Sequence, residues 1–175
     1  MIFSQVEYFF FFSLCFAVYW LTPRRGKVWV LLLASNLFYA TWNAKYLLLI
    51  WLSTLIDYVA ARGIQRARER DGGTNWLVLS LISNLGVLAV FKYYGFFIDS
   101  VASLMSAVGV AAHLPTLEVL LPVGISFYTF QSMSYTIDVW RGDRDPEPSL
   151  IYFATYVSFF PQLVAGPIER ATHLL

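Results

Sequence analysis

The feature that most constrains this chain is a series of long apolar blocks that carry almost no charge. The blocks cover residues 8–22, 28–43, 46–61, 72–91, 93–113, 119–137 and 148–168. A helix rises about 1.5 Å per residue, so about 20 apolar residues cross the hydrocarbon core of a bilayer. The last four blocks reach about that length, and flanking aromatic and basic side chains extend the first three. The blocks predict an all-α, polytopic helical membrane protein with about six to seven apolar segments.

Composition supports this fold class. Hydrophobic residues make up 58% of the 175 residues and charged residues only 13%, against about 25% charged residues in soluble domains. The net charge of +1 and the absence of a basic and aromatic pattern give no reason to expect a nucleic-acid partner. With Cys15 as the only cysteine, no intrachain disulfide or thiolate metal cluster can form, and we expect no metal or cofactor. No domain boundary interrupts residues 1–175, which we interpret as one membrane domain.

The charges between the first blocks predict an orientation. Glu7 precedes the first block, and basic residues follow the first and third blocks at Arg24, Arg25, Lys27, Arg62, Arg66, Arg68 and Arg70. Basic loops stay in the cytoplasm, so this pattern predicts a retained first span with a periplasmic N-terminus. Asp57 lies about one turn before Arg62, the nearest arginine that follows it, and we expect Asp57 to form an ion pair with a neighbouring arginine at the cytoplasmic interface.

The segment LPVGISFYTFQSMSYTIDVWRG, residues 121–142, is apolar yet rich in hydrogen-bonding groups. At 100° per residue, Gln131, Ser134 and Asp138 fall within about 60° of each other. Ser126, Thr129 and Thr136 fall in a different sector. Two polar sectors predict contacts on both sides of one helix inside a bundle. Such groups either hold neighbouring helices together or line a cavity, and the pattern leaves both interpretations open.

The segment FFPQLVAGPIER, residues 159–170, places Pro161, Pro167 and Gln162 in an apolar run. Proline removes a helical hydrogen bond and clashes with the preceding turn. This segment therefore predicts a broken or re-entrant element rather than a continuous helix.

Together, these two segments resemble the membrane-bound O-acyltransferase family, specifically its alginate O-acetylase branch. MIFSQVEYFFFF, LLLASNLFYATW and FKYYGFFIDS resemble the same branch in the same order. The resemblance implies a multi-pass protein of the bacterial cytoplasmic (inner) membrane that acetylates an exported polysaccharide such as alginate. It also implies a cytoplasmic acyl donor, which we expect to be acetyl-CoA, and periplasmic polysaccharide-modifying partner proteins.

The family's helices surround a central funnel. On that basis we expect the substrate funnel to include or be supported by Ser126, Tyr128, Gln131, Ser134, Asp138, Gln162, Glu169 and Arg170. The family's essential histidine lies in a later membrane segment, and neither His113 nor His173 matches its context. We therefore assign no catalytic residue and expect the N-terminal part of a longer acyltransferase. The rival interpretation is a non-enzymatic membrane protein, either a transporter half or an assembly scaffold.

We predict that these 175 residues alone do not transfer acyl groups, because they carry no histidine in the expected context. The measurement is acetyl transfer from acetyl-CoA by the purified polypeptide in detergent. Turnover above a protein-free control would contradict the prediction.

Overall fold

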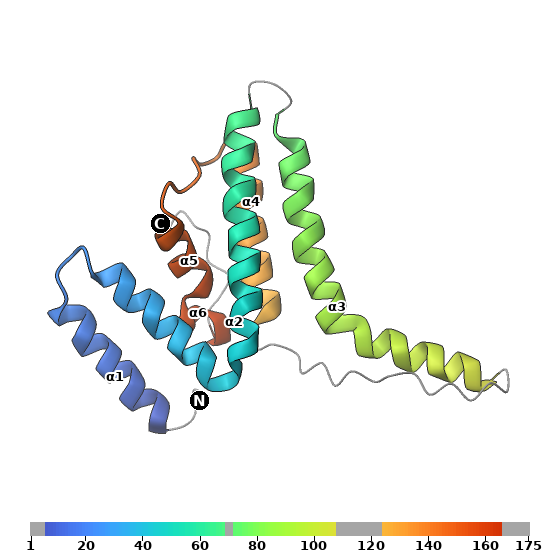
Figure 1. The fold of residues 1–175 in the computed structure, drawn as a ribbon, viewed down its shortest axis with the longest axis horizontal. Helices are drawn as coiled ribbons and strands as arrows, with labels where there is room; N and C mark the ends of the chain where they lie inside the picture. Colours follow the sequence, from blue (N-terminus) through green and yellow to red (C-terminus); the bar gives the residue numbers. More distant parts are fainter. Residues whose placement is uncertain (1–5, 69–71, 108–123, 166–175) are drawn as a thin grey trace.

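The structure is a computed structural model that describes residues 6–68, 72–107 and 124–165. These residues form helices and connecting turns, with no strand among them, which confirms the all-α fold class (Figure 1). The helices are α1 (Val6–Leu21), α2 (Lys27–Ala67), α3 (Thr74–Ala107), α4 (Ile125–Arg141), α5 (Leu150–Ser158) and α6 (Phe160–Ala165).

The apolar blocks become helices, but the divisions between them differ from the prediction. The second and third blocks join in α2, where the only interruption is Asn43 with φ −163° and ψ 108°. The fourth and fifth blocks join in α3, so Lys92 lies inside a helix and does not end it. Within the described residues, two stretches are long and apolar enough to cross a membrane, Asn43–Ala67 and Thr74–Tyr93.

Helix α2 is the centre of the arrangement, because it contacts each of the other described helices. Its N-terminal half lies beside α1, and its C-terminal half lies between α3 and α5 in Figure 1, with α4 behind it. The side chains of Ala60, Ala61 and Ile64 in that half are completely buried. Small residues here let neighbouring helices approach closely, as is common where membrane helices pack.

A left-handed glycine bounds α4 at each end. Gly124 precedes the helix with φ 78°, and Gly142 follows it with φ 86°. At the C-terminal end, the Asp143 N–H donates to the Asp138 carbonyl at 2.9 Å, and the Gly142 N–H donates to the Val139 carbonyl at 3.1 Å. This is the Schellman arrangement that commonly ends a helix at glycine. Gly124 thus marks the beginning of α4.

The last apolar block is broken, as its prolines predicted. Phe159 separates α5 from α6 with φ −58° and ψ 106°. The break frees the Phe160 N–H, which donates to the buried Ser35 hydroxyl of α2 at 3.3 Å. Beyond the break, the Gln162 N–H donates to the Phe159 carbonyl at 3.1 Å. A side chain from another helix therefore satisfies backbone that the break exposes, as an apolar environment demands. The second proline, Pro167, lies outside the described residues.

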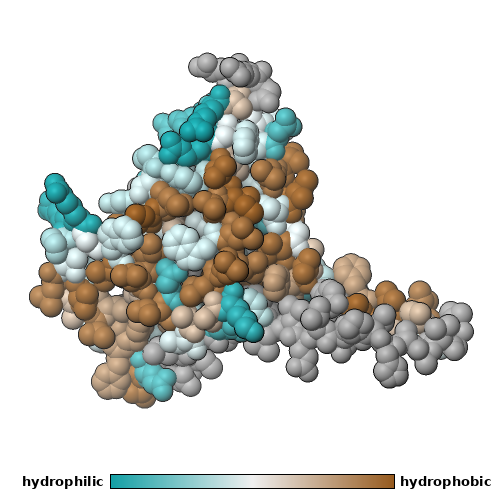
Figure 2. Space-filling view, viewed as in Figure 1, coloured by the Kyte–Doolittle hydropathy of each residue, from teal (hydrophilic) through white to brown (hydrophobic). Residues whose placement is uncertain are grey.

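Much of the surface is apolar. Figure 2 shows hydrophobic residues across much of the visible face, with hydrophilic groups at its top and left edges and in smaller patches in its lower middle. Helix α1 has no buried residue, and side chains such as Phe10 and Leu21 are 74% and 86% exposed. Contiguous apolar surface of this kind marks contact with a membrane or with other protein.

Two glycine substitutions test how closely α2 and α3 pack. A methyl group on buried Gly63 would collide with the Trp76 ring, whereas one on Gly86 would meet nothing. Alanine is favoured over glycine inside a helix by about 1 kcal/mol, while overpacking costs about 1–3 kcal/mol. We therefore predict that Gly63→Ala lowers the free energy of unfolding by about 1 kcal/mol and that Gly86→Ala raises it slightly. Thermal unfolding in detergent, followed by circular dichroism, measures both, and equal shifts would refute the close contact.

Candidate functional site

A buried polar network lies where α2 and α3 meet. The Asp57 side chain of α2 is completely buried, and Asn84 of α3 is 1% exposed. The Asn84 amide nitrogen Nδ2 donates to both Asp57 carboxylate oxygens, at 2.8 Å to Oδ1 and 2.9 Å to Oδ2. The Ser80 hydroxyl, one turn earlier on α3, donates to Asp57 Oδ1 at 2.6 Å. Hydrogen bonds to a carboxylate are shorter and stronger than those between neutral groups.

The network extends to a third helix through the Asn84 carbonyl oxygen. Ser53 of α2 donates to Asn84 Oδ1 at 2.8 Å, and Ser132 of α4 approaches the same atom at 3.4 Å. Both serines are buried. The Asn84 side chain of α3 thus donates from its amide nitrogen to α2 and accepts at its carbonyl oxygen from hydroxyls of α2 and α4. These hydrogen bonds join the three helices. A register shift between α2 and α3 would leave buried polar groups without partners, which is costly.

The expected ion pair between Asp57 and Arg62 is wrong. The described hydrogen bonds of Asp57 come from Ser80 and Asn84. The Arg62 guanidinium instead donates to the Tyr58 hydroxyl at 2.9 Å and the Pro148 carbonyl at 3.3 Å. Arg62 therefore fixes the linker between α4 and α5 against α2, while the carboxylate points into the bundle.

A second polar contact joins the two segments that sequence analysis singled out. Gln131 of α4 and Gln162 of α6 are 2% and 8% exposed. The Gln131 amide nitrogen Nε2 donates to the Tyr156 carbonyl at 2.9 Å and approaches Gln162 Oε1 at 3.4 Å. This contact and the Ser132 contact lie on different sides of α4. They confirm that α4 makes polar contacts on two sides, and both contacts are between helices.

The other candidates on α4 are less enclosed. Ser126, Ser134 and Asp138 are half-buried, and the Ser134 hydroxyl donates to the Gln131 carbonyl of its own helix at 2.9 Å. Tyr128 is completely buried, and its hydroxyl has no hydrogen-bond partner in the described part of the chain. The neighbouring Thr129 hydroxyl is also buried without a partner there.

Two sequence candidates, Glu169 and Arg170, lie outside the described residues. The two histidines that were assigned no role, His113 and His173, also lie outside them. The structure thus brings Gln131 and Gln162 together, keeps Ser134 and Asp138 on a half-open side of α4, and leaves the Glu169–Arg170 pair unassigned. Within the described ranges, no group of three His, Cys, Asp or Glu residues is placed to hold a metal ion.

Sequence analysis missed the residues that hold Asp57. Ser53 and Asp57 are four residues apart on α2, and Ser80 and Asn84 are four residues apart on α3. Residues at this spacing share one side of a helix. A pair of polar residues at i and i+4 in each of two apolar blocks was therefore the available signal. It indicates a polar side on each helix, although it does not reveal that the two sides face one another.

Known O-acetylating proteins are similar to this chain over most of its length. "Probable alginate O-acetylase AlgI" of Pseudomonas aeruginosa is 40% identical over 178 residues, which cover 98% of this chain and 33% of that protein. The protein of the same name in Azotobacter vinelandii is 40% identical over 173 residues, covering 98% of this chain and 34% of its own. "Peptidoglycan O-acetyltransferase" of Helicobacter pylori is 32% identical over 177 residues, covering 87% and 32%. No family model matches, and no solved structure matches.

In the described residues, this is an all-helical, strongly apolar chain with two helices long and apolar enough to cross a membrane. It is a partial homologue of the alginate O-acetylase-like branch of the membrane-bound O-acyltransferases, which confirms the resemblance found in the sequence. The chain spans about a third of the length of the curated relatives it matches.

Replacing Asn84 tests the network between the helices. Asn84→Ala removes two hydrogen bonds from a buried carboxylate, and an unsatisfied buried group costs about 1–3 kcal/mol, or more when charged. We predict a loss of at least about 2 kcal/mol in the free energy of unfolding in detergent. Ser83→Ala is the matched control, because the Ser83 hydroxyl donates only to carbonyls of its own helix. Equal stability of the two variants would contradict a role for Asn84 in joining the helices.

Proposed function

We propose that this chain is part of a membrane-bound O-acyltransferase that transfers acetyl groups to an exported polysaccharide. The observation that carries the proposal is similarity of about 40% identity over nearly the whole chain to proteins named as alginate O-acetylases. The Helicobacter pylori relative is named for peptidoglycan. Both names describe acetyl transfer to a carbohydrate polymer, so the shared chemistry is acylation of a sugar hydroxyl.

We further propose that the chain lies in the bacterial inner membrane as a multi-pass protein with its N-terminus in the periplasm. Two membrane-length helices support this location. Figure 1 places the C-terminal end of α2 near the top of the view and the bend in α2 near the bottom, with the α1–α2 loop at the left edge between these two levels. The basic residues Arg24 and Arg25 belong to that loop, and Arg62 and Arg66 to the C-terminal part of α2. Because basic segments stay in the cytoplasm, both regions would face it.

The polar side chains of α4 would shape the path of the substrate. Gln131 is fixed by the Tyr156 carbonyl and Gln162, so it would support the wall of a funnel. Ser134 and Asp138 are half-buried on the adjoining side of α4, and Ser126 is half-buried in the other sector near the start of the helix. The oxygens of these three side chains could meet a polar substrate. The acyl transfer itself requires a base that takes the proton from the acceptor hydroxyl, and we assign that role to no described residue.

The donor in this proposal is acetyl-CoA from the cytoplasm, and the partners are periplasmic polysaccharide-modifying proteins. Acetyltransferase relatives support an acyl donor and a polysaccharide or peptidoglycan acceptor. A transporter half or an assembly scaffold is not favoured, because the similar proteins are named as transferases.

A chimera tests the proposal. The matching third of the Pseudomonas aeruginosa alginate O-acetylase would be replaced by this chain, and the chimera expressed in a strain that lacks its own acetylase. We expect the exported alginate to regain acetate esters, detected by proton NMR. A chimera carrying an unrelated helical membrane segment of equal length is the control. Correct insertion without any acetate ester would contradict the proposal, and esters on peptidoglycan alone would identify the acceptor as peptidoglycan.

A further inference from the structure

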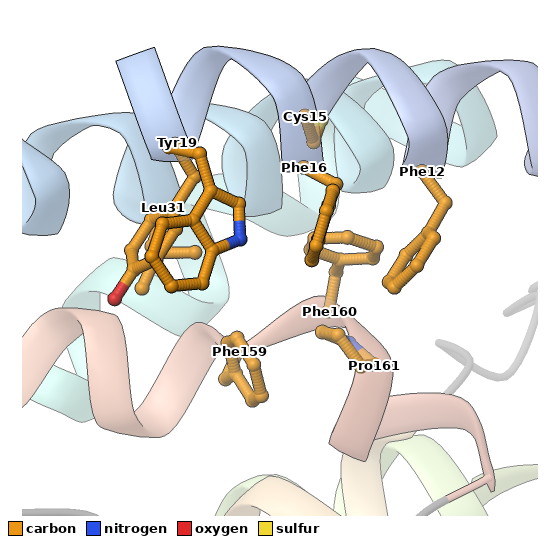
Figure 3. Close-up of a pocket in the computed structure, with 9 residues that line it drawn as sticks. Phe12, Cys15, Phe16, Tyr19, Leu31, Phe159, Phe160 and Pro161 are labelled. Carbon is orange, nitrogen blue, oxygen red and sulfur yellow. The ribbon is translucent and has the colours of Figure 1, made fainter. Parts of the chain in front are cut away.

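An apolar cavity of about 300 Å³ lies between α1, α2 and the break that separates α5 from α6. Figure 3 shows its side chains converging from α1 on one side and from the break on the other. Phe12, Cys15 and Phe16 come from α1, Leu31 from α2, and Phe159 and Pro161 from the break. The lining is almost entirely aromatic and aliphatic carbon, so it offers little to a polar ligand.

The shape of this cavity follows from the broken helix. Phe160 turns inward at the break and is 2% exposed. Its ring centroid lies 5.4 Å from those of both Phe11 and Phe38. This aromatic contact closes the inner end, while Phe16, 57% exposed, leaves the outer side accessible. The result is a cavity that opens from the apolar surface of α1.

Positive charge lies beside one end of the cavity. The Lys27 ammonium group lies 4.5 Å from the Tyr19 ring centroid and 4.8 Å from the Trp20 ring centroid, and both rings line the cavity. Arg24 and Arg25 are exposed in the same α1–α2 loop, which contains no acidic residue. Basic and aromatic side chains in this arrangement are typical of the level of lipid headgroups.

We propose that this cavity binds one acyl chain of an anionic phospholipid, whose headgroup phosphate contacts Lys27, Arg24 and Arg25. An apolar cavity continuous with apolar surface fits a hydrocarbon chain, and the cluster of cations at its end complements a phosphate. A neutral hydrocarbon would leave these three cations without a counter-charge. The proposal rests on the membrane location in the proposed function, but not on acyl transfer.

Cys15 provides a direct test, because it lines the cavity and is the only cysteine in the chain. The full chain would be placed in nanodiscs of phosphatidylcholine, with or without phosphatidylglycerol, and the rate of Cys15 modification by N-ethylmaleimide measured. We expect phosphatidylglycerol to slow the reaction several-fold. Lys27→Gln combined with Arg24→Gln should abolish that difference, whereas Lys45→Gln, at the bend in α2, should preserve it.

Two controls separate lipid binding from other causes. Leu14→Cys with Cys15→Ser moves the thiol to an exposed neighbouring position, 64% exposed in the native chain, where phosphatidylglycerol should not slow labelling. Phosphatidylglycerol with a photoactivatable group in its acyl chain should crosslink to residues 12–20 and 159–161.

Specific outcomes would overturn the proposal. These are equal labelling of Cys15 in both lipids, equal protection of Leu14→Cys, or crosslinks confined to other residues. Protection in both lipids alike would mean that another protein segment covers the cavity. None of these measurements requires acetyl transfer, and the chimera assay requires no particular lipid, so failure of one proposal is distinguishable from failure of the other.

Discussion

The arrangement of the helices depends on one buried carboxylate that has no cationic partner among the described residues. Asp57 is held by Ser80 and Asn84 of α3, and Asn84 in turn meets Ser132 of α4. Apolar surfaces can slide past one another with little change in free energy, especially in lipid, where no hydrophobic driving force joins helices. A buried carboxylate cannot slide, because each lost donor has a large cost. Asp57 therefore fixes the register of α2 against α3. Through Asn84, α4 also contacts the α2–α3 interface at this point.

The break at Phe159 is the second constraint, and it works through the backbone. A freed N–H inside an apolar bundle must find an acceptor, and Ser35 of α2 supplies one. That hydrogen bond holds the break against the N-terminal half of α2, where Phe160 then packs on Phe38. The same break places Gln162 beside Gln131. One irregular turn thus determines both the polar contact of α4 and the apolar cavity beside α1.

Sequence reasoning was reliable where a property is local. The long apolar blocks predicted helices, and the prolines predicted the break after α5. It failed for Asp57, because Arg62 is five residues away and therefore about 140° around a helix. Nearness along the chain suggested an ion pair that the helix geometry opposes. The true partners belong to α3, and which polar sides face each other depends on tertiary packing that one sequence does not reveal.

The same reasoning limits where a substrate path could run along α4. One side of that helix is occupied by Thr129, Ser132 and Thr136, which are fully buried, and Gln131 is held on another. Ser134 and Asp138 lie next to Gln131 on the half-open arc. Tight interhelical contacts on two sides leave this arc as the part of α4 whose oxygens are still accessible. In the proposed acyl transfer, the interhelical contacts would hold α4 rigid while the half-open arc meets the substrate. A preorganised site is generally built in this way, with supporting contacts that fix the groups facing the substrate.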